Sequence, residues 1–137
     1  GSTSTAVGAA NVQKRTTVLI TGDLSFIYDS NALWNNTKQK NLKIIVINNE
    51  GGSIFNILPG PKTTPYKKEY FETKHNIDFQ NLAHTFQIKH QRVEDEINAN
   101  EKLDNILKSN QAEILEFFTG DAENEKILND YFRTIKK

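Results

Sequence analysis

Val-Leu-Ile-Thr-Gly-Asp-Leu-Ser, residues 18–25, is the stretch that decides the fold, and Ile-Ile-Val-Ile-Asn-Asn-Glu-Gly-Gly, residues 44–52, repeats its design. Each is an apolar run followed at once by polar, glycine-bearing residues, which is the pattern of a buried strand that ends in a turn. In an open parallel sheet, loops that leave strands on the same side line one crevice, where ligands bind. We therefore expect Gly22, Asp23, Asn49 and Gly51 to lie around one site.

The elements around these two stretches predict an α/β fold. A strand over Thr17–Thr21, a helix from about Phe26 to Lys40 and a strand over Asn41–Asn48 make a βαβ unit with a right-handed crossover. The second strand is nearly continuously apolar, as strands covered on both faces are. The sequence thus predicts three layers, with a doubly wound, mostly parallel sheet and helices on both faces.

The remaining chain continues this alternation. A long loop from Leu58 to about Tyr70 contains Pro59, Gly60, Pro61 and Pro65, and loops of this length are often lids or binding loops. Three further helices are predicted over Ser2–Gln13, from a cap at Asp78 through Phe86, and over Glu94–Ser109. Two further strands are predicted over Ile88–Val93 and Ala112–Thr119. A closing amphipathic helix is predicted over Asp121–Lys137, and its buried side consists of Ile127, Leu128, Tyr131, Phe132 and Ile135.

Composition limits the possible functions. The 137 residues suffice for one domain over 1–137, and 17 basic residues balance 17 acidic ones, which argues against nucleic acid and anionic membrane surfaces as partners. There is no cysteine, hence no disulfide and no zinc–thiolate site. No apolar run reaches the roughly 20 residues of a membrane span. The absence of methionine indicates a piece of a longer protein, with Gly1-Ser2 either natural or a tag remnant.

The two turns suit a magnesium–diphosphate site. Backbone N–H groups after Gly22 favour an anion at the start of a helix, but Asp23 places a carboxylate in the same region. A divalent cation between the two anions resolves the conflict, and Mg²⁺ prefers oxygen ligands of this kind. Asn49 offers an amide oxygen and Gly51 a main-chain oxygen. Each motif alone is more often a simple turn or cap, whereas both together, with 25 residues between Asp23 and Asn49, favour a site.

Other polar residues give weaker signals. His75, His84 and His90 are spaced too irregularly to predict a metal site, so surface or supporting roles are expected. Lys62, Lys67 and Lys68 on the long loop are interpreted as solvated surface, with steering of anionic substrates as the alternative. Asp29 and Asn31 either brace the site or are ordinary polar residues at the start of a helix.

The motifs resemble those of one enzyme family. Gly22 to Ser25 read Gly-Asp-Leu-Ser, Tyr28 to Leu33 read Tyr-Asp-Ser-Asn-Ala-Leu, Val46 to Phe55 read Val-Ile-Asn-Asn-Glu-Gly-Gly-Ser-Ile-Phe, and Leu58-Pro59 follows. Thiamine diphosphate enzymes carry Gly-Asp-Gly and, 25 to 30 residues later, Asn-Asn. Here Leu24 replaces the last glycine, and with the Gly-Gly-x-Ile-Phe continuation the chain resembles the C-terminal domain of 2-succinyl-5-enolpyruvyl-6-hydroxy-3-cyclohexene-1-carboxylate (SEPHCHC) synthase, or MenD. Gly1 to Ala10 resembles the start of that domain.

The resemblance implies roles for individual residues. Asp23, the Asn49 side chain and the main-chain oxygen of Gly51 would bind Mg²⁺, with Mn²⁺ as a possible substitute. Gly22, Leu24 and Ser25 would contact the diphosphate of the cofactor. An apolar wall near the thiazolium and the substrate pocket would be formed by Ile54, Phe55 and Leu58, for which core packing is the alternative.

The resemblance also implies an activity and partners. The family is a transferase of menaquinone (vitamin K2) biosynthesis that decarboxylates 2-oxoglutarate and adds the resulting succinyl semialdehyde unit to isochorismate. Its activating glutamate lies in an N-terminal pyrimidine-binding domain of a second subunit, in a cytoplasmic homodimer or homotetramer. No stretch of this chain matches that domain, so the fragment alone is expected to contain no catalytic residue and to be inactive.

Two alternatives remain at this stage. Another thiamine diphosphate enzyme, such as an acetolactate synthase or a 2-oxoacid decarboxylase, shares the Asp and Asn positions, but Leu24 and Gly51-Gly52-x-Ile54-Phe55 argue against it. A receiver-like signalling domain is also α/β with acids at strand ends. It needs paired acids after its first strand, and here only Asp23 is in place.

Overall fold

The computed structural model describes residues 1–35, 40–56, 58, 60, 63–120 and 124–135. These residues form two compact units, one made of 1–48 and 77–118 and the other of 49–76 and 119–137, each described below by itself. Pro59, Pro61 and Lys62 of the predicted loop lie outside the described residues, as do Ile57 and parts of the two predicted helices that span 36–39, 121–123 and 136–137. The single domain expected from the sequence stays a prediction.

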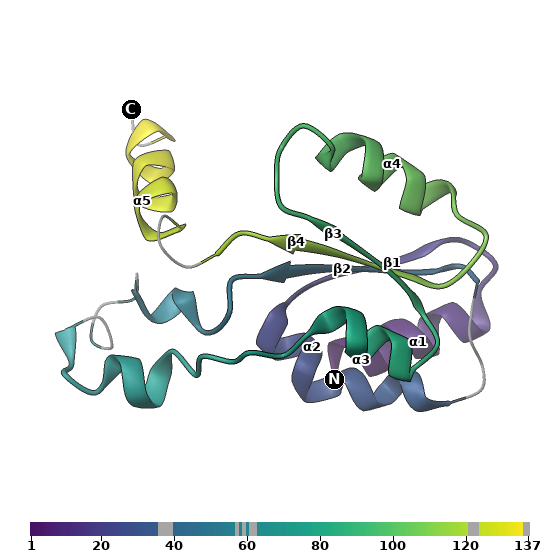
Figure 1. Ribbon diagram of the computed structural model, residues 1–137, viewed down its shortest axis with the longest axis horizontal. Helices are drawn as coiled ribbons and strands as arrows, with labels where there is room; N and C mark the ends of the chain where they lie inside the picture. Colours follow the sequence, from purple (N-terminus) through teal and green to yellow (C-terminus); the bar gives the residue numbers. More distant parts are fainter. Residues whose placement is uncertain (36–39, 57, 59, 61–62, 121–123, 136–137) are drawn as a thin grey trace. The chain divides into compact units, whose positions relative to one another are not determined.

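A parallel four-stranded sheet is the centre of the first unit (Figure 1). Its order is β1-β2-β4-β3, so β2 and β4 are central and β1 and β3 are edges. The strands are β1 (Thr17–Gly22), β2 (Leu42–Asn48), β3 (Lys89–Val93) and β4 (Glu113–Phe118). The register places Gly22 opposite Ile47 and Asn48 opposite Phe118, so β1 and β2 end at the same edge of the sheet. The four predicted strands and the parallel α/β fold are confirmed.

Helices cover both faces of the sheet (Figure 1). Those of the first unit are α1 (Ser2–Val12), α2 (Asp23–Asp29), the 3₁₀ helix η1 (Ser30–Trp34), α3 (Phe79–Thr85) and α4 (Ala99–Lys108). On one face, α1, α2, η1 and α3 enclose a core that includes Phe26, stacked 5.7 Å from Phe79 between ring centroids. Complete burial of such a side chain contributes about 1.5–3 kcal/mol. On the other face, α4 packs Ile106 against Leu115 and Val93.

The α4 face is covered over β3 and β4 but not over β1. Val18 and Ile20 point to this face of β1 and are 42% and 68% exposed. Ile47 of β2 lies on the same face and is 37% exposed. These three side chains form a bare apolar strip beside the edge of the sheet.

Helix boundaries differ from the prediction in two places. The helix expected from Phe26 begins earlier, at Asp23, and after Asp29 it tightens into the 3₁₀ turn that ends at Trp34. The helix expected from Glu94 begins only at Ala99, because the Asp95 carboxylate accepts a hydrogen bond from the Asn98 backbone and holds the preceding residues in a turn. Asp78 caps α3 as predicted, its side chain accepting the Asn81 N–H at 3.0 Å.

The start of α1 is tied to the end of α2 through Asp29. Its carboxylate accepts hydrogen bonds from the Ser4 backbone N–H at 2.7 Å and from the Ser4 hydroxyl at 2.5 Å. An ion pair of 3.3 Å with the Gly1 amino group adds to them. Asp29 thus satisfies an N–H group in the first turn of α1, and this contact gives the Tyr28-Asp29 motif a structural role.

A buried lysine and a buried glutamate lie at the amino ends of the central strands. Lys43 is 1% exposed, and its ammonium donates to the carbonyl oxygens of Lys40, Ser109 and Gln111. Burial lowers the pKa of Lys43, an effect that the nearby Glu113 charge opposes. Glu113, also 1% exposed, pairs with Lys89 at 2.8 Å. These contacts fix the segment before β4 to the start of β2.

The second unit contains the 3₁₀ helix η2 (Ser53–Asn56), the π-helix η4 (Lys67–Phe71) and the helix α5 (Asn124–Ile135). The prediction of a buried face on α5 is wrong for most of its members. Ile127, Tyr131 and Ile135 are each about 60% exposed, and Phe132 is 44% exposed. Only Leu128 of the five is half-buried, and within this unit α5 contacts η2.

Titration of Asp29 tests the contact between α1 and α2. Hydrogen bonds from the Ser4 hydroxyl and backbone lower the pKa of Asp29 to about 2 from the usual 3.8. Because the folded pKa lies below the unfolded one, this contact stabilises the fold fully above pH 4, and the contribution is lost as the pH falls through 2. We expect the Asp29 carboxyl carbon to titrate near pH 2 by NMR, and at a higher pH in Ser4→Gly, which removes the hydroxyl but keeps the backbone N–H. An unshifted Asp29 in the wild type would contradict the contact.

Candidate functional site

Asp23 lies where β1 gives way to α2. It is the first residue of the helix, it is 3% exposed, and its Oδ1 accepts the Leu24 backbone N–H at 2.7 Å. Ser25, in the same first turn, is exposed. The structure thus places a buried carboxylate and an exposed hydroxyl at the carboxyl end of β1. The Leu24 N–H that the sequence assigned to a diphosphate is used by Asp23.

Gly22 is not held in a special conformation. The sequence suggested tight backbone geometry there, but its φ and ψ of −79° and 162° are extended values open to any residue. Among the described residues, no atom lies within 4 Å of the position that a Cβ on Gly22 would take. Packing within the chain therefore does not require glycine at this position.

Gly51 and Gly52 are glycines for a reason inside the second unit. Gly51 has a φ of +151°, and an added Cβ would lie 2.5 Å from the Glu72 carbonyl oxygen. A Cβ on Gly52 would lie 2.8 Å from the Phe71 carbonyl oxygen, and the Gly52 N–H donates to Glu72 O at 2.5 Å. Both glycines are buried under residues 71–74 of the same unit. They let the turn after β2 pack against this segment.

The other predicted site residues of the second unit differ in exposure. Asn49 follows β2 directly and is half-buried. Ile54 and Leu58 are 59% and 42% exposed, so neither is a core residue of this chain. Phe55 is half-buried and packs edge-on against Phe71, with ring centroids 5.4 Å apart. Core packing thus accounts for part of the Phe55 surface, while the exposed Ile54 and Leu58 present apolar surface outward.

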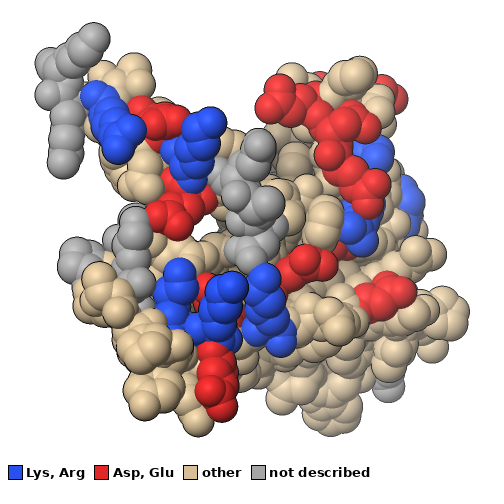
Figure 2. Space-filling model, turned by 60° about the vertical axis from the view of Figure 1, so that its left-hand side comes forward, with Lys and Arg blue, Asp and Glu red and all other residues tan. Residues whose placement is uncertain are grey.

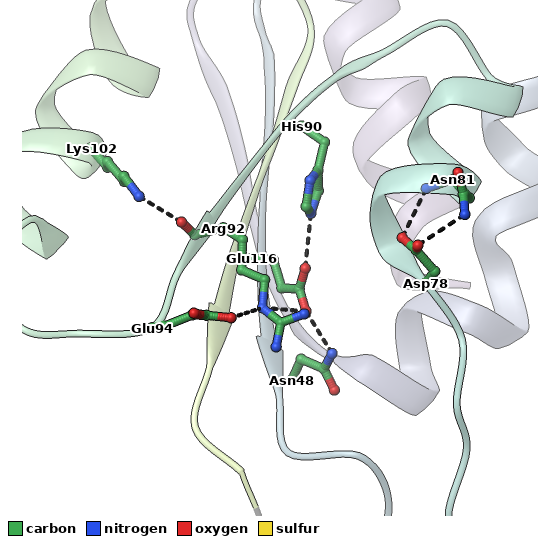
Figure 3. Close-up of polar contacts among 8 residues, drawn as sticks. All are labelled: Asn48, Asp78, Asn81, His90, Arg92, Glu94, Lys102 and Glu116. Carbon is green, nitrogen blue, oxygen red and sulfur yellow. Dashed lines mark hydrogen bonds and ion pairs between the residues drawn. The ribbon is translucent and has the colours of Figure 1, made fainter.

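A buried carboxylate that the sequence analysis missed lies at the carboxyl end of the central strands. Glu116 of β4 is 2% exposed. Its Oε1 accepts a hydrogen bond from the Asn48 amide at 2.7 Å, and its Oε2 lies 2.9 Å from His90 Nε2 (Figure 3). Arg92 Nε lies 4.0 Å from Oε1 and 2.9 Å from Glu94. The detectable signal was a single acidic residue inside the apolar run Ile114–Phe118, at a position whose side chain had to be buried.

The surroundings of Glu116 keep it ionised. Burial alone would raise the pKa of Glu116, but hydrogen bonds from His90 and Asn48 and the Arg92 charge outweigh it, and the pKa lies below its ordinary value. The Arg92 guanidinium also stacks over the Phe118 ring, 4.0 Å from its centroid. A cavity of about 240 Å³ lies beside this cluster, lined by Asp78, Gln80, His90, Gln91, Arg92 and Glu116.

Charge and cavities elsewhere do not point to a second site. A larger hollow of about 610 Å³, lined by residues such as Val12, Lys14 and Asn41, lies at the amino ends of the strands, whereas ligands of open α/β sheets bind at the carboxyl ends. On the face drawn in Figure 2, basic and acidic side chains lie next to one another, in accord with a net charge of zero. Lys67 of the long loop pairs with the buried Glu72 at 3.6 Å.

The donor atoms predicted for a metal suit a hard cation. A carboxylate, a side-chain amide and a main-chain carbonyl, from Asp23, Asn49 and Gly51, are all oxygen ligands of the type Mg²⁺ takes. Within the described ranges, no group of three or more His, Cys, Asp or Glu gathers in a way that could hold a metal. None of the helices in the described part of the chain is long and apolar enough to cross a membrane.

Comparison with known proteins identifies relatives over nearly the whole chain. Residues 2–117 match the family model "Thiamine pyrophosphate enzyme, C-terminal TPP binding domain". Proteins named 2-succinyl-5-enolpyruvyl-6-hydroxy-3-cyclohexene-1-carboxylate synthase are similar to this chain: that of Flavobacterium johnsoniae is 50% identical over 136 residues, that of Christiangramia forsetii 40% over 141, and that of Bacteroides fragilis 36% over 143. These alignments cover 98–99% of this chain but only 24–25% of each relative. The chain thus spans about a quarter of the length of these relatives.

Substitution of Gly51 tests the packing of the turn after β2. We expect Gly51→Ala to accelerate hydrogen exchange of the Gly52 amide at least tenfold, because the new methyl group collides with the Glu72 carbonyl that accepts this hydrogen bond. Gly8→Ala is the matched control, since a Cβ on this residue of α1 meets no described atom within 4 Å. Equal Gly52 exchange rates in both variants would show that the turn does not need glycine.

Proposed function

The chain belongs to the thiamine pyrophosphate (thiamine diphosphate) enzymes, as their C-terminal TPP binding domain, and from this premise we propose that it serves a SEPHCHC synthase. The whole enzyme decarboxylates 2-oxoglutarate and transfers the succinyl semialdehyde unit to isochorismate, a step of menaquinone biosynthesis. The observation that carries the proposal is the identity of up to 50%, over almost the entire chain, to proteins with this name. The alternative of a receiver-like signalling domain has no comparable support.

Within this function, the chain binds the diphosphate end of the cofactor. Asp23, Asn49 and the Gly51 carbonyl coordinate Mg²⁺, or Mn²⁺ in its place, and Gly22, Leu24 and Ser25 lie along the diphosphate. This assignment is supported by the positions of Asp23 directly after β1 and of Asn49 directly after β2, since β1 and β2 are neighbouring parallel strands that end at one edge. It is also supported by the open space around Gly22, because packing among the described residues does not explain a glycine there.

The apolar residues after the turn contribute to the substrate side. Ile54, Phe55 and Leu58 form a wall near the thiazolium, and the exposure of Ile54 and Leu58 leaves their surface available for this contact. The bound cofactor supplies the electron sink for decarboxylation, and an apolar wall keeps water away from the reacting atoms. The pyrimidine half is held by an N-terminal domain of a second subunit, in a homodimer or homotetramer that works in the cytoplasm.

Replacement of Asp23 tests the metal assignment. In the full-length enzyme, we expect Asp23→Ala to raise the Mg²⁺ concentration for half-maximal activity at least 100-fold, because the only side-chain charge on the proposed metal is removed. The assay uses 2-oxoglutarate, isochorismate and thiamine diphosphate, with Mg²⁺ varied. Asp104→Ala on the exposed surface of α4 is the control and keeps the wild-type dependence. A wild-type Mg²⁺ dependence in Asp23→Ala would refute the assignment.

Substitution of Gly22 tests whether glycine is needed at this position for cofactor binding or for folding. We expect Gly22→Ala to leave the melting temperature of the cofactor-free full-length enzyme within about 2 °C of wild type, because its Cβ meets no described atom. The dissociation constant for thiamine diphosphate, measured by calorimetry, should increase at least tenfold, because the methyl group occupies space next to the diphosphate. Unchanged affinity would remove Gly22 from the site.

An assay of the isolated 137-residue chain tests whether activity requires the N-terminal domain of the proposed enzyme. We expect no turnover of 2-oxoglutarate above a blank, because the group that activates the aminopyrimidine belongs to the absent domain. The measurement is carbon dioxide release with saturating cofactor and Mg²⁺, beside the full-length enzyme as a positive control. Turnover by the isolated chain would show that it holds a complete catalytic apparatus.

A further inference from the structure

Glu116 is a charged residue at a position where the fold calls for an apolar one. It lies in the central strand β4, directly opposite Val46 of β2, on the face that packs against α1, α2 and α3. Its neighbour two residues earlier on that face, Ile114, is a core residue. A buried ionised carboxylate is costly unless every partner is in place, and replacement by an apolar residue of similar size is often neutral or stabilising. Stability of the sheet alone therefore does not account for Glu116.

The closest hydrogen-bond partner of Glu116 is the side chain at the end of β2. Its shortest hydrogen bond is with the Asn48 amide, at 2.7 Å and buried from solvent (Figure 3). Asn48 is the last residue of β2, 4% exposed, and the next residue along the chain is Asn49. The side chain of Asn48 is thus fixed at the point where β2 becomes the turn that carries Asn49 and Gly51.

The remaining contacts orient the carboxylate rather than compete for Asn48. His90 lies on the neighbouring strand β3, opposite Ile114, and its Nε2 lies 2.9 Å from Oε2 of Glu116. The Asn48 amide donates to the other carboxylate oxygen, Oε1. Arg92 lies directly opposite Glu116 in the register and supplies positive charge at 4.0 Å. Because the two carboxylate oxygens have separate hydrogen-bond partners on β2 and β3, rotation of the carboxylate would break both contacts.

We propose that Glu116 is a positioning residue for the magnesium site: through Asn48 it fixes the end of β2, the residue to which the proposed ligand Asn49 is directly joined. The inference rests on the proposed function, because Asn49 and Gly51 are metal ligands only if that function holds. Groups that orient metal ligands from behind are worth 10- to 100-fold in metal affinity in known sites. Glu116 touches neither cofactor nor substrate in this role.

The chain offers a matched control on the same strand. Glu113 is as buried as Glu116, at 1% exposure, and is likewise held by a hydrogen bond and an ion pair, from Gln91 and Lys89. It points to the opposite face of β4 and lies at the amino end of the strand. Removal of Glu113 therefore imposes the loss of a buried carboxylate on the sheet without touching Asn48.

The experiment measures Mg²⁺ binding to the full-length protein by isothermal titration calorimetry in the presence of thiamine diphosphate, at a temperature where each variant is folded by circular dichroism. We expect Glu116→Ala to weaken Mg²⁺ binding 10- to 100-fold and Glu113→Ala to change it less than twofold. Asn48→Ala should match Glu116→Ala, and the double variant should be no weaker than either single one, because both remove the same hydrogen bond.

The outcomes separate this inference from the function on which it rests. Loss of Mg²⁺ binding in Asp23→Ala with wild-type affinity in Glu116→Ala overturns the role of Glu116 and keeps the metal site. Wild-type affinity in Asp23→Ala overturns the proposed metal site itself, on which the role of Glu116 rests. Equal losses in Glu113→Ala and Glu116→Ala, or additive losses in the Asn48 and Glu116 double variant, overturn the positioning role in favour of general destabilisation.

A variant that keeps the shape of the Glu116 side chain provides a second test in case Glu116→Ala does not fold. Glu116→Gln retains an oxygen that accepts from Asn48 but loses the charge that faces His90 and Arg92. We expect it to lower Mg²⁺ affinity less than Asn48→Ala does. Should Glu116→Ala fail to fold, wild-type Mg²⁺ affinity in Asn48→Ala would by itself overturn the proposal, since the hydrogen bond would then have no effect on the metal.

Discussion

Strand β2 is held against β4 by a buried polar side chain at each of its ends, and the register of these two central strands depends on these contacts. At the amino end, the Lys43 ammonium donates to the carbonyls of Ser109 and Gln111, just before β4. At the carboxyl end, Asn48 donates to Glu116 within β4. A slip of the register by one residue would turn Lys43 and Asn48 to the wrong faces and leave both buried groups without partners. The apolar residues between them provide most of the burial, and the two polar ends select one register.

The glycines of the two turns serve different purposes, although they look alike in the sequence. Gly51 and Gly52 are dictated by the chain itself, because the backbone of residues 71–74 lies where their side chains would be. Gly22 has an ordinary extended conformation, and no described residue beyond its chain neighbours lies within 4 Å of where its Cβ would be.

The sequence predicted the sheet because its signal is local. The apolar run Ile44–Val46 is buried on both faces, as its composition predicts for a central parallel strand. It failed where structure depends on distant partners. The apolar side of α5 has a helical period whether or not anything covers it, so periodicity could not reveal that Tyr131 stays exposed. The start of α4 was misplaced because a local contact of Asp95 competes with helix formation.

The candidate site was predictable to the extent that its residues follow strands. Asp23 and Asn49 could be predicted as ligands because strand ends are recognisable and the spacing between them matches a family, and the structure places them directly after β1 and β2. Glu116 was missed because it lies inside a strand, and its meaning comes from pairing with Asn48, which is 68 residues away. A lone acid in an apolar strand is a weak sign by itself and becomes informative only when the register shows which residue it faces.

The bare strip of Val18, Ile20 and Ile47 has a consequence for handling the protein. It lies beside the open edge of β1, where unpaired backbone groups and apolar side chains occur together. Native proteins protect such edges with charge, proline or a covering element, because an uncovered edge is a template for pairing between chains. The three residues of the strip are all uncharged. With a pI of about 7.0, the chain also has little net charge to keep copies apart near neutral pH. Concentrated solutions of the 137-residue chain are therefore best kept well away from neutrality.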